Sequence, residues 1–349
     1  MDKEVIFAVA GSGKTKYIID ALSLGKRSLI VTYTNNNLRT LRRRILGKFG
    51  YFPDNIFVSS YFTFLYSFCY RPFLSQKFKT RGINYKSNPN KGLRLTDPRY
   101  FFDSYRRIYG NRIAKFLDVQ GILGDINLRL SKYFDTLLID EVQDLAGHDF
   151  NLLKGISKAN LSIIAVGDFY QHTFDTSRDG NVNSSLHDDY DLYKGKFEDM
   201  GFSVDTESLI ASHRCSPNIC DFISKDIGVE MSSARNDNTS IYLIEKQEQA
   251  DEIFNNRHMV KLFYREHYKY ECYSRNWGES KGEDGHSDVC VVLNKTTLDK
   301  FRKNKLIELS SQTKNKLYVA CSRARGDLYL VPENLYEKHK RLKISVSPK

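Results

Sequence analysis

Residues 8–15 form the stretch that most constrains how this chain can fold. They read AVAGSGKT, which matches the pattern [A/G]-x-x-x-x-G-K-T with alanine in the first place. The run before the motif, residues 5–9, is apolar and β-rich, and residues 16–24 are compatible with a helix. A strand, a glycine-rich turn and a helix in this order are the context in which the pattern forms a phosphate-binding loop.

The loop residues have separate expected roles. Gly11 and Gly13 allow backbone N–H groups to close around phosphate oxygens. Lys14 is expected to reach the β- and γ-phosphates, and the Thr15 hydroxyl is a ligand for Mg²⁺. The helix that begins here directs the positive end of its dipole at the anion. The pattern therefore predicts ATP and Mg²⁺ as cofactors, with the binding residues Ala10, Gly11, Ser12, Gly13, Lys14 and Thr15.

A second motif, TLLIDEVQD, occupies residues 136–144. An apolar strand here delivers two adjacent carboxylates at its end. Asp140 is expected to hold Mg²⁺ through water, and so is a second candidate metal residue beside Thr15. Glu141 is placed to orient or deprotonate an attacking water, as phosphoryl transfer to water requires.

A third stretch repeats this logic. Residues 161–166 predict a strand, and its exit reads GDFYQ. Gln171, the last residue of that exit, is placed to sense a γ-phosphate by a direct or a water-mediated hydrogen bond. Phe174 follows three residues later and is a candidate to face a nucleic-acid base.

The rest of the first half contains two further strand predictions, residues 27–33 and 55–60. A basic helix is expected over residues 38–48, and its arginines either contact a phosphate backbone or form a solvated helix face. The aromatic run 61–68 favours a core over a stacking platform. Residues 70–130 are rich in Lys, Arg, Tyr and Asn and predict an insertion in the first domain. Within it, residues 97–121 show helical spacing. Residues 77–94 predict a loop, which either binds nucleic acid or is simply exposed to solvent.

Composition limits the class of protein. The net charge of +11 indicates a polyanionic partner. The six cysteines are scattered without a C-x-x-C pair, which favours reduced thiols in a cytoplasmic protein. No apolar run approaches the length that spans a bilayer, and the N-terminal residues lack a signal-peptide pattern, so no membrane partner is expected.

In order along the chain, AGSGKT, VTYTNNN, FTFLYSF, LLIDEVQD and VGDFYQ resemble the motifs of the UvrD/Rep/PcrA-like superfamily 1 helicases. The D-E-x-Q-D pattern of that family is intact at residues 140–144. Residues 212–217, SHRCSP, look like its fourth motif, residues 280–283, SKGE, like its fifth, and residues 318–325, YVACSRAR, like its sixth. The resemblance spans nearly the whole chain.

The resemblance implies roles for residues of the second half. Arg214 is expected to contact the γ-phosphate, and Arg323 to act as an arginine finger from the second domain. The ribose-contacting carboxylate is Glu283 or Asp284. Residues that match nucleic-acid contacts at strand ends and in the later motifs are Thr32, Thr34, Asn35, Thr63, Phe64, Phe174 and Ser280.

The departures from that family also carry information. None of the seven residues before Ala8 is a glutamine that reads adenine, so loose base selectivity is expected. The third motif lacks its usual Trp, and the stretch between Arg214 and Lys281 leaves no room for the large second-domain insertion.

Together these observations predict an α/β chain with two RecA-like P-loop NTPase domains, each a doubly wound parallel sheet. Residues 1–207 are expected to form the first domain, with a small, mostly helical insertion at about 70–130, and residues 208–349 the second. The predicted function is an ATP-dependent single-stranded DNA translocase or helicase, moving 3′→5′ by resemblance, which hydrolyses nucleotide in the cleft between the two domains. The alternative is a nucleic-acid-stimulated ATPase subunit that regulates or delivers a protein partner such as a nuclease, with little unwinding of its own.

Overall fold

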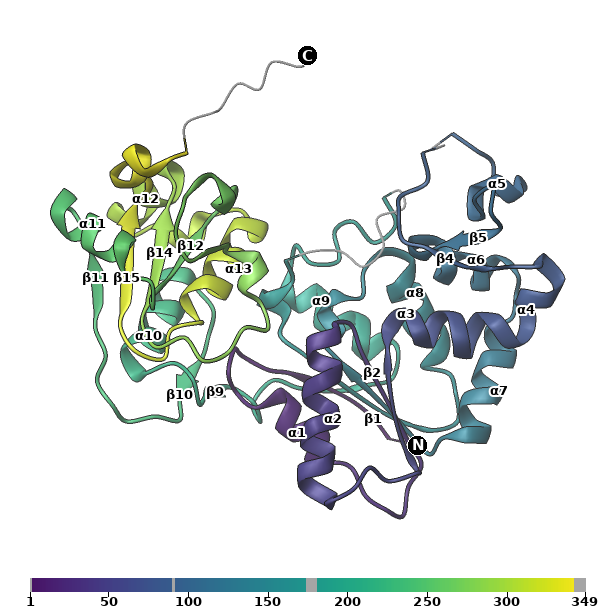
Figure 1. Cartoon of the computed structure of the whole chain (residues 1–349). Coiled ribbons are helices and arrows are strands. Elements are labelled where there is room, and N and C mark those ends of the chain that lie inside the picture. Colours follow the sequence, from purple (N-terminus) through teal and green to yellow (C-terminus); the bar gives the residue numbers. More distant parts are fainter. Residues whose placement is uncertain (1, 90–91, 174–180, 342–349) are drawn as a thin grey trace. The chain divides into compact units, whose positions relative to one another are not determined.

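The structure is a computed structural model that describes residues 2–89, 92–173 and 181–341 (Figure 1). The chain divides into two compact units. The first contains Met1–Phe7 and Lys14–Thr206, and the second contains Ala8–Gly13 and Glu207–Lys349. Phe174 lies outside the described residues, so its predicted role stays a prediction.

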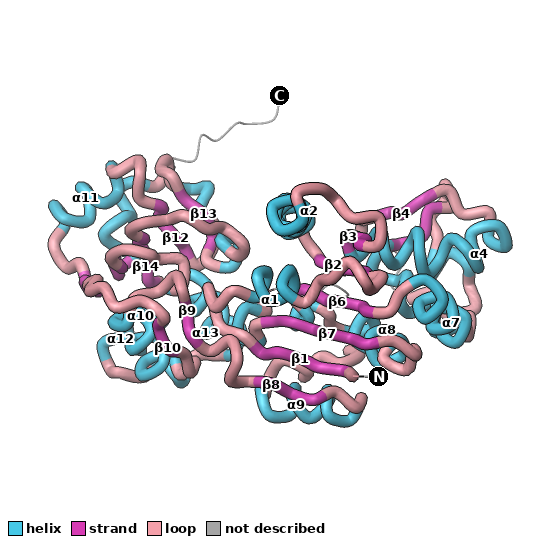
Figure 2. Tube along the Cα trace, turned by 90° about the horizontal axis from the view of Figure 1, so that it is seen from below, coloured by secondary structure: helices cyan, strands magenta, loops and turns pink. Residues whose placement is uncertain are grey.

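The first unit is built on a six-stranded parallel sheet with the order β3-β2-β6-β7-β1-β8, whose strands lie side by side in Figure 2. Strand β2 reads SLIVT and is buried at every position, as expected of a central strand covered on both faces. The predicted strands at residues 27–33, 55–60 and 136–140 are present in this sheet. Its strands are β1 (Lys3–Phe7), β2 (Ser28–Thr32), β3 (Ile56–Ser60), β6 (Thr136–Asp140), β7 (Ser162–Gly167) and β8 (Ser203–Asp205).

Helices cover both faces of this sheet. Helices α1 and α2 pack against each other, and α9 lies beside β8 (Figure 2). Helix α2 begins where the Thr34 hydroxyl accepts a hydrogen bond from the N–H of Asn37, and it ends at Gly50 in the left-handed conformation. The covering helices are α1 (Lys14–Asp20), α2 (Asn35–Phe49), α8 (Gly147–Ile156) and α9 (Tyr190–Asp199).

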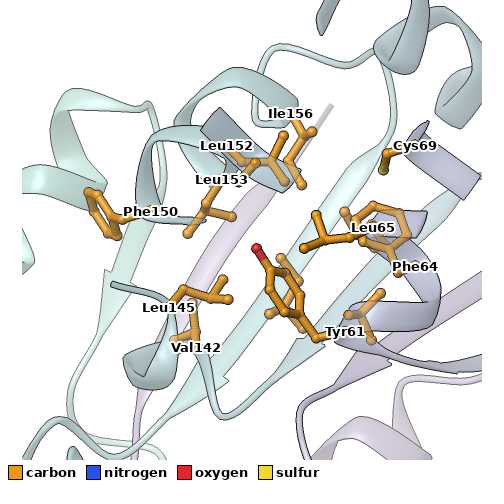
Figure 3. Close-up of a cluster of buried hydrophobic side chains, with 14 of the residues drawn as sticks. Tyr61, Phe64, Leu65, Cys69, Val142, Leu145, Phe150, Leu152, Leu153 and Ile156 are labelled. Atoms are coloured by element: carbon orange, nitrogen blue, oxygen red, sulfur yellow. The ribbon is translucent and has the colours of Figure 1, made fainter. Parts of the chain in front are cut away.

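The insertion between β3 and β6 packs an aromatic cluster against the sheet and α8. Figure 3 shows Tyr61, Phe64 and Leu65 pointing toward Leu153 and Ile156. Its helical elements are α3 (Tyr61–Thr63), a π-helical segment (Phe64–Tyr70), α4 (Arg71–Phe78), α5 (Pro98–Phe101), α6 (Ile113–Val119) and α7 (Leu123–Tyr133).

The helical spacing predicted over residues 97–121 is wrong in its middle part. The carboxylate of Asp103 accepts hydrogen bonds from the N–H groups of Tyr105 and Arg107, and Arg106 has a φ of 59°. This turn ends the helical stretch and leads into a two-stranded parallel sheet of β4 (Gly82–Asn84) and β5 (Arg107–Tyr109). A local side-chain to backbone network thus overrides the apolar spacing.

The second unit contains a five-stranded parallel sheet with the order β11-β15-β14-β12-β13, and a short pair of β9 (Ala211–Ser212) and β10 (Ser232–Ser233). Strand β14 is buried at every position, and the indole of Trp277 is fully buried with its N–H donated to the carbonyl of Leu262. The strands of the larger sheet are β11 (Ile241–Leu243), β12 (Val260–Phe263), β13 (Ser274–Asn276), β14 (Val289–Leu293) and β15 (Leu328–Pro332). Its helices are α10 (Pro217–Phe222), α11 (Gln247–Asn255), α12 (Lys295–Arg302) and α13 (Ser311–Cys321).

The packing of α9 gives a stability prediction. Phe197 is fully buried and its ring contacts Phe7 at 5.5 Å and Phe150 at 5.8 Å between centroids. Phe197→Ala should lower the free energy of unfolding by about 3–5 kcal/mol, because it removes a large apolar side chain and leaves a cavity. Leu192 lies on the same helix with 70% of its surface exposed, so Leu192→Ala should change the stability by less than about 0.5 kcal/mol. Chemical denaturation of both variants checks this difference, and equal effects would contradict it.

Candidate functional site

The glycine-rich loop lies between β1 and α1, as the sequence predicts. Gly11 and Gly13 have φ values of 75° and 97°, a region that favours glycine. The Ser12 hydroxyl is buried and donates to the carbonyl of Val9 at 2.8 Å, which closes the turn from inside. Helix α1 then begins at Lys14, and Thr15 follows it in a half-buried position.

Inside the second unit, the loop backbone contacts the segment that carries Arg214. The Ser212 hydroxyl donates to the carbonyl of Ala10 at 2.7 Å, and the N–H of His213 donates to the carbonyl of Gly11 at 2.9 Å. A Cβ atom added at Gly11 would lie 2.6 Å from the Cβ of Arg214. A side chain at position 11 is therefore excluded both by backbone conformation and by space.

The hydroxyl of Tyr318 also reaches this loop. It accepts a hydrogen bond from the N–H of Ala10 at 2.7 Å. Tyr318 is fully buried on α13, in the stretch that the sequence identified as the sixth motif. The second unit thus holds the loop at Ala10 from two sides, through one hydroxyl that donates and one that accepts.

Three charged residues of the first unit follow its strands. The ammonium group of Lys14 forms an ion pair with the carboxylate of Asp168 at 3.9 Å, and Asp168 is buried. The carboxylate of Asp140, also buried, accepts hydrogen bonds from the Thr32 hydroxyl at 3.0 Å and from the Asn37 amide at 3.4 Å. These donors orient the carboxylate of Asp140, which suits an indirect Mg²⁺ ligand.

Glu141 has an uncommon backbone conformation for a non-glycine residue, with a φ of 58°. Its carboxylate accepts a hydrogen bond from the side-chain amide of Gln143 at 2.5 Å. The oxygen of the same amide accepts the N–H of Asp168 at 3.0 Å. One buried amide therefore joins Glu141 to the turn that follows β7.

Space around Gln143 is tight. A Cβ added at Gly167 would lie 2.4 Å from the Gln143 amide oxygen and 2.8 Å from a methyl group of Val142. Gln143 has no role predicted from the sequence, although it is part of the D-E-x-Q-D pattern. Asn37 has none either, because nothing in the local sequence links that residue to Asp140.

Gln171 ends a short 3-10 turn, Phe169–Gln171, directly after β7. It is buried, and its backbone N–H donates to the carbonyl of Asp168 at 2.9 Å. Gln171 thus lies three residues after Asp168, which contacts both Lys14 and Gln143. Its predicted contact with a γ-phosphate stays a prediction.

The structure brings the two predicted arginines of the second unit together. Arg323 is only 2% exposed; its guanidinium donates to the carbonyls of Val319 at 3.1 Å and Glu283 at 3.2 Å. Burial, and after it the nearby positive charge of Arg214, lower the pKa of Arg323 to about 10. Arg323 thus remains charged at neutral pH, although it lies in an environment that disfavours its charge.

The two candidate ribose carboxylates both have ion-pair partners in the second unit. Asp284 pairs with the guanidinium of Arg214, which also donates to the carbonyl of Ser322 at 3.1 Å. Glu283 contacts Arg275 at 3.1 Å and the ring of His286 at 3.2 Å. Their side chains are therefore engaged with protein groups in this structure.

The predicted nucleic-acid residues divide into buried and accessible groups. Phe64 is buried in the core cluster of Figure 3, and Ser280 is buried with its hydroxyl donated to the carbonyl of Trp277 at 2.7 Å. Thr32 is also buried and serves Asp140. Asn35 and Thr63 are exposed and Thr34 is half-buried, so these three keep a surface for a ligand.

In residues 2–89, 92–173 and 181–341, no cluster of three or more His, Cys, Asp or Glu side chains is arranged to hold a metal. Within the same ranges, no helix has the length and apolar character needed to cross a membrane.

Comparison with solved structures shows the class of fold. The chain is similar to a complex of Arterivirus nonstructural protein 10 (helicase) with DNA, at 14% identity and a TM-score of 0.50, over 96% of this chain and 62% of that one. It also matches a crystal structure of the same Arterivirus helicase (13% identity, TM-score 0.49, 98% and 62% covered) and the PRRSV helicase (15%, 0.48, 96% and 53%). The chain thus spans between 53% and 62% of the length of these helicases. No curated protein matches.

A family model described as the viral superfamily 1 RNA helicase core domain matches residues 123–331. The chain therefore belongs to this family, a class of NTP-hydrolysing enzymes. The predictions of an α/β fold with parallel, RecA-like sheets and of a superfamily 1 helicase core are confirmed.

The contacts of Gln143 lead to a kinetic prediction. Gln143→Ala should lower NTP turnover by at least about tenfold, because general-base catalysis as a whole contributes about 10²–10⁴ and Glu141 loses its orienting donor. Gln143→Glu should move the acid limb of the pH–rate profile to higher pH, since a second carboxylate raises the pKa of Glu141. Steady-state rates across pH check both.

Gln120 provides the matched control. Its side-chain oxygen accepts a hydrogen bond from Lys77, away from the strand ends. Gln120→Ala should leave the rate and its pH profile unchanged. A Gln143→Glu profile that coincides with wild type would exclude a positioning role for Gln143.

Proposed function

We propose that this chain is an NTP-driven motor that moves on single-stranded nucleic acid. The observation that carries the proposal is the contact of the phosphate loop with the segment of Arg214. It brings the segment that carries Arg214 against the backbone that would hold a nucleotide phosphate. A guanidinium group beside a bound phosphate suits phosphoryl transfer, because it stabilises the charge that develops on the phosphate.

The residues of the first unit suit the chemistry of hydrolysis. Lys14 exchanges its ion pair with Asp168 for the β- and γ-phosphates when nucleotide binds. Glu141, oriented by Gln143, accepts a proton from water as the water oxygen bonds to the γ-phosphorus and the bond to the leaving diphosphate breaks. Mg²⁺, held by the Thr15 hydroxyl and indirectly by Asp140, would neutralise charge on the phosphates.

The second unit contributes permanent positive charge. We propose that Arg214 and Arg323 stabilise the charge that develops on the γ-phosphate. Their planar guanidinium groups offer several fixed donors, which a lysine does not. In this proposal Asp284 holds Arg214 until nucleotide phosphates compete for it.

Nucleic acid is proposed to bind at the carboxyl ends of the strands. Thr34, Asn35 and Thr63 follow β2 and β3 and are accessible. In the second unit, a cavity of about 610 Å³ is lined by cationic side chains such as Arg265 and Lys295, together with the carboxylates of Glu266, Glu308 and Glu333. Cationic side chains there would contact phosphates, so we expect binding to weaken as salt rises.

Several finer features are part of the same proposal. The D-E-x-Q-D motif supports a UvrD-like helicase that moves 3′→5′ on DNA. A cytoplasmic location and ATP as the usual nucleotide belong to the same proposal. RNA is the second polymer to test, since the description of the matching family names RNA helicases. Strand displacement by the purified protein distinguishes a helicase from an ATPase subunit that delivers a partner such as a nuclease.

The function is tested first by hydrolysis. Wild-type protein should hydrolyse ATP and GTP at comparable rates, and single-stranded DNA or RNA should stimulate both. Glu141→Gln should retain nucleotide binding and lose turnover, because it removes only the base, whereas Lys14→Ala should lose both. Phosphate release and fluorescent-nucleotide binding measure these effects. A Glu141→Gln rate near wild type would show that another residue is the base, and rates unaffected by any single strand would contradict the motor.

Arg323 separates a two-unit motor from a simple nucleotide binder. Arg323→Ala should depress turnover on the order of 10³–10⁵-fold, the range seen for arginine fingers, with a much smaller loss of nucleotide affinity. Arg323→Lys should rescue little, because an ammonium does not reproduce the planar fork. Turnover and affinity are measured together with thermal unfolding of each variant.

Arg325 is the control two residues away, and it is exposed. Arg325→Ala should reduce turnover only mildly. Equal and small effects at both positions would leave the YVACSRAR stretch as a basic surface without a catalytic role.

A further inference from the structure

A groove runs along one edge of the sheet of the first unit, away from the residues assigned above to nucleotide. Strand β3 is the terminal strand in the order β3-β2-β6-β7-β1-β8, and it pairs only with β2 within the described chain. A cavity of about 660 Å³ lies against it. Its walls come from α2, the turn before β3, the π-helical segment and Phe134.

The outer edge of β3 offers unpaired backbone groups. The N–H of Ser28 donates to the carbonyl of Asn55, and the register pairs Ser28 with Ile56. In this parallel pattern the groups of Phe57 and Ser59 point toward β2, so those of Val58 point outward. No hydrogen bond to either outward group of Val58 occurs in residues 2–89, 92–173 and 181–341. An open edge of this kind is a template for another strand.

Exposed aromatic rings lie beside the edge. Phe57 is 50% exposed, although its ring packs edge-on against Phe134 at 5.4 Å. Phe52 contributes a second exposed ring from the preceding turn. Because successive side chains of an added strand point to opposite faces, alternate apolar residues of a bound segment would fill one side while its polar residues pointed away.

The charge beside the groove is positive. Helix α2 reads NNNLRTLRRRILGKF and contains no acidic residue. Arg42 lines the cavity, and Arg43 and Arg44 follow it in an exposed position. In the described part of the chain, none of these three arginines forms an ion pair. The only carboxylate among the residues that line the cavity is that of Asp54.

We propose that this groove binds an extended segment of another protein, with alternating apolar and acidic residues, by strand addition to β3. The backbone of the segment pairs with Val58, its apolar side chains contact Phe57 and Phe52, and its carboxylates contact Arg42. The proposal is independent of NTP hydrolysis, because none of these residues belongs to the nucleotide site. Thr63, which is proposed above to contact nucleic acid, also lines the cavity.

A polypeptide fits these features better than a nucleic acid does. Arginines and exposed rings would also suit phosphates and bases. The outward N–H and C=O groups of Val58, however, alternate donor and acceptor at the spacing of a peptide backbone, which a nucleotide chain does not match. The expected ladder therefore distinguishes the two classes of partner.

The probe is a fluorescein-labelled peptide in which valine or phenylalanine alternates with glutamate, titrated with the full chain. Val58→Pro should weaken binding by at least about tenfold, a loss of about 1.4 kcal/mol, because it removes the outward N–H. The strand should still form, since proline is tolerated where the N–H faces away from the ladder. Val58→Thr is the matched control and should bind as wild type does.

A variant of the peptide needs no change to the protein. Methylation of alternate backbone nitrogens removes the N–H donors that would pair with the carbonyl of Val58, and it should weaken binding by a similar factor. Arg42→Glu should favour a peptide in which lysines replace the glutamates. The unfolding temperature and the NTP hydrolysis rate of Val58→Pro should match those of wild type. Weaker peptide binding by this variant would then result from the missing N–H group and not from unfolding.

Three results would overturn the proposal. The first is undiminished binding of the methylated peptide. The second is displacement of the peptide by single-stranded DNA in wild type and Val58→Thr alike, with Val58→Pro binding the DNA equally well. The third is self-association through β3, seen as a wild-type dimer that Val58→Pro converts to monomer.

Discussion

Parallel pairing of the strands is the constraint on which the candidate site depends. Because every strand of the first sheet points the same way, the ends of β1, β2, β6 and β7 meet at one edge. The register sets Phe7 beside Gly167 and Asp140 beside Val166, so the residues that follow these strands are brought within contact range. Lys14, the two acidic residues at the end of β6 and the turn with Asp168 belong to distant parts of the sequence, and the sheet of the first unit joins them.

Local sequence predicted much of this. The glycine-rich loop, the carboxylates at Asp140 and Glu141, and the position of Gln171 all follow strands whose apolar runs are visible without a structure. These predictions succeed because a short motif and its flanking strand are read from adjacent residues. The prediction for 97–121 failed in part, because one aspartate side chain reorganised the backbone around it.

Other features depend on contacts that adjacent residues do not reveal. Phe64 and Ser280 were selected by their motif positions, yet both are buried, since only tertiary packing decides which side of a turn faces the core. The bond from Asn37 to Asp140 and the ion pair of Arg214 with Asp284 link residues far apart in the sequence. Gln143 was visible in a motif, but its two partners are set by how closely the turns after β6 and β7 approach.

The hydrogen bond from Ala10 to Tyr318 has a consequence for measured affinity. If the N–H of Ala10 is among those that receive a phosphate oxygen, the tyrosine hydroxyl competes with the ligand for the same donor. The protein then exists as a mixture of conformations, of which only the fraction with that N–H released is ready to bind. The apparent dissociation constant is the intrinsic constant divided by that fraction. The hydrogen bond between Tyr318 of α13 and the loop would thus compete with the nucleotide inside the protein. The nucleotide concentration at half-saturation would then depend on how often this hydrogen bond is broken, as well as on the strength of the contacts with the nucleotide.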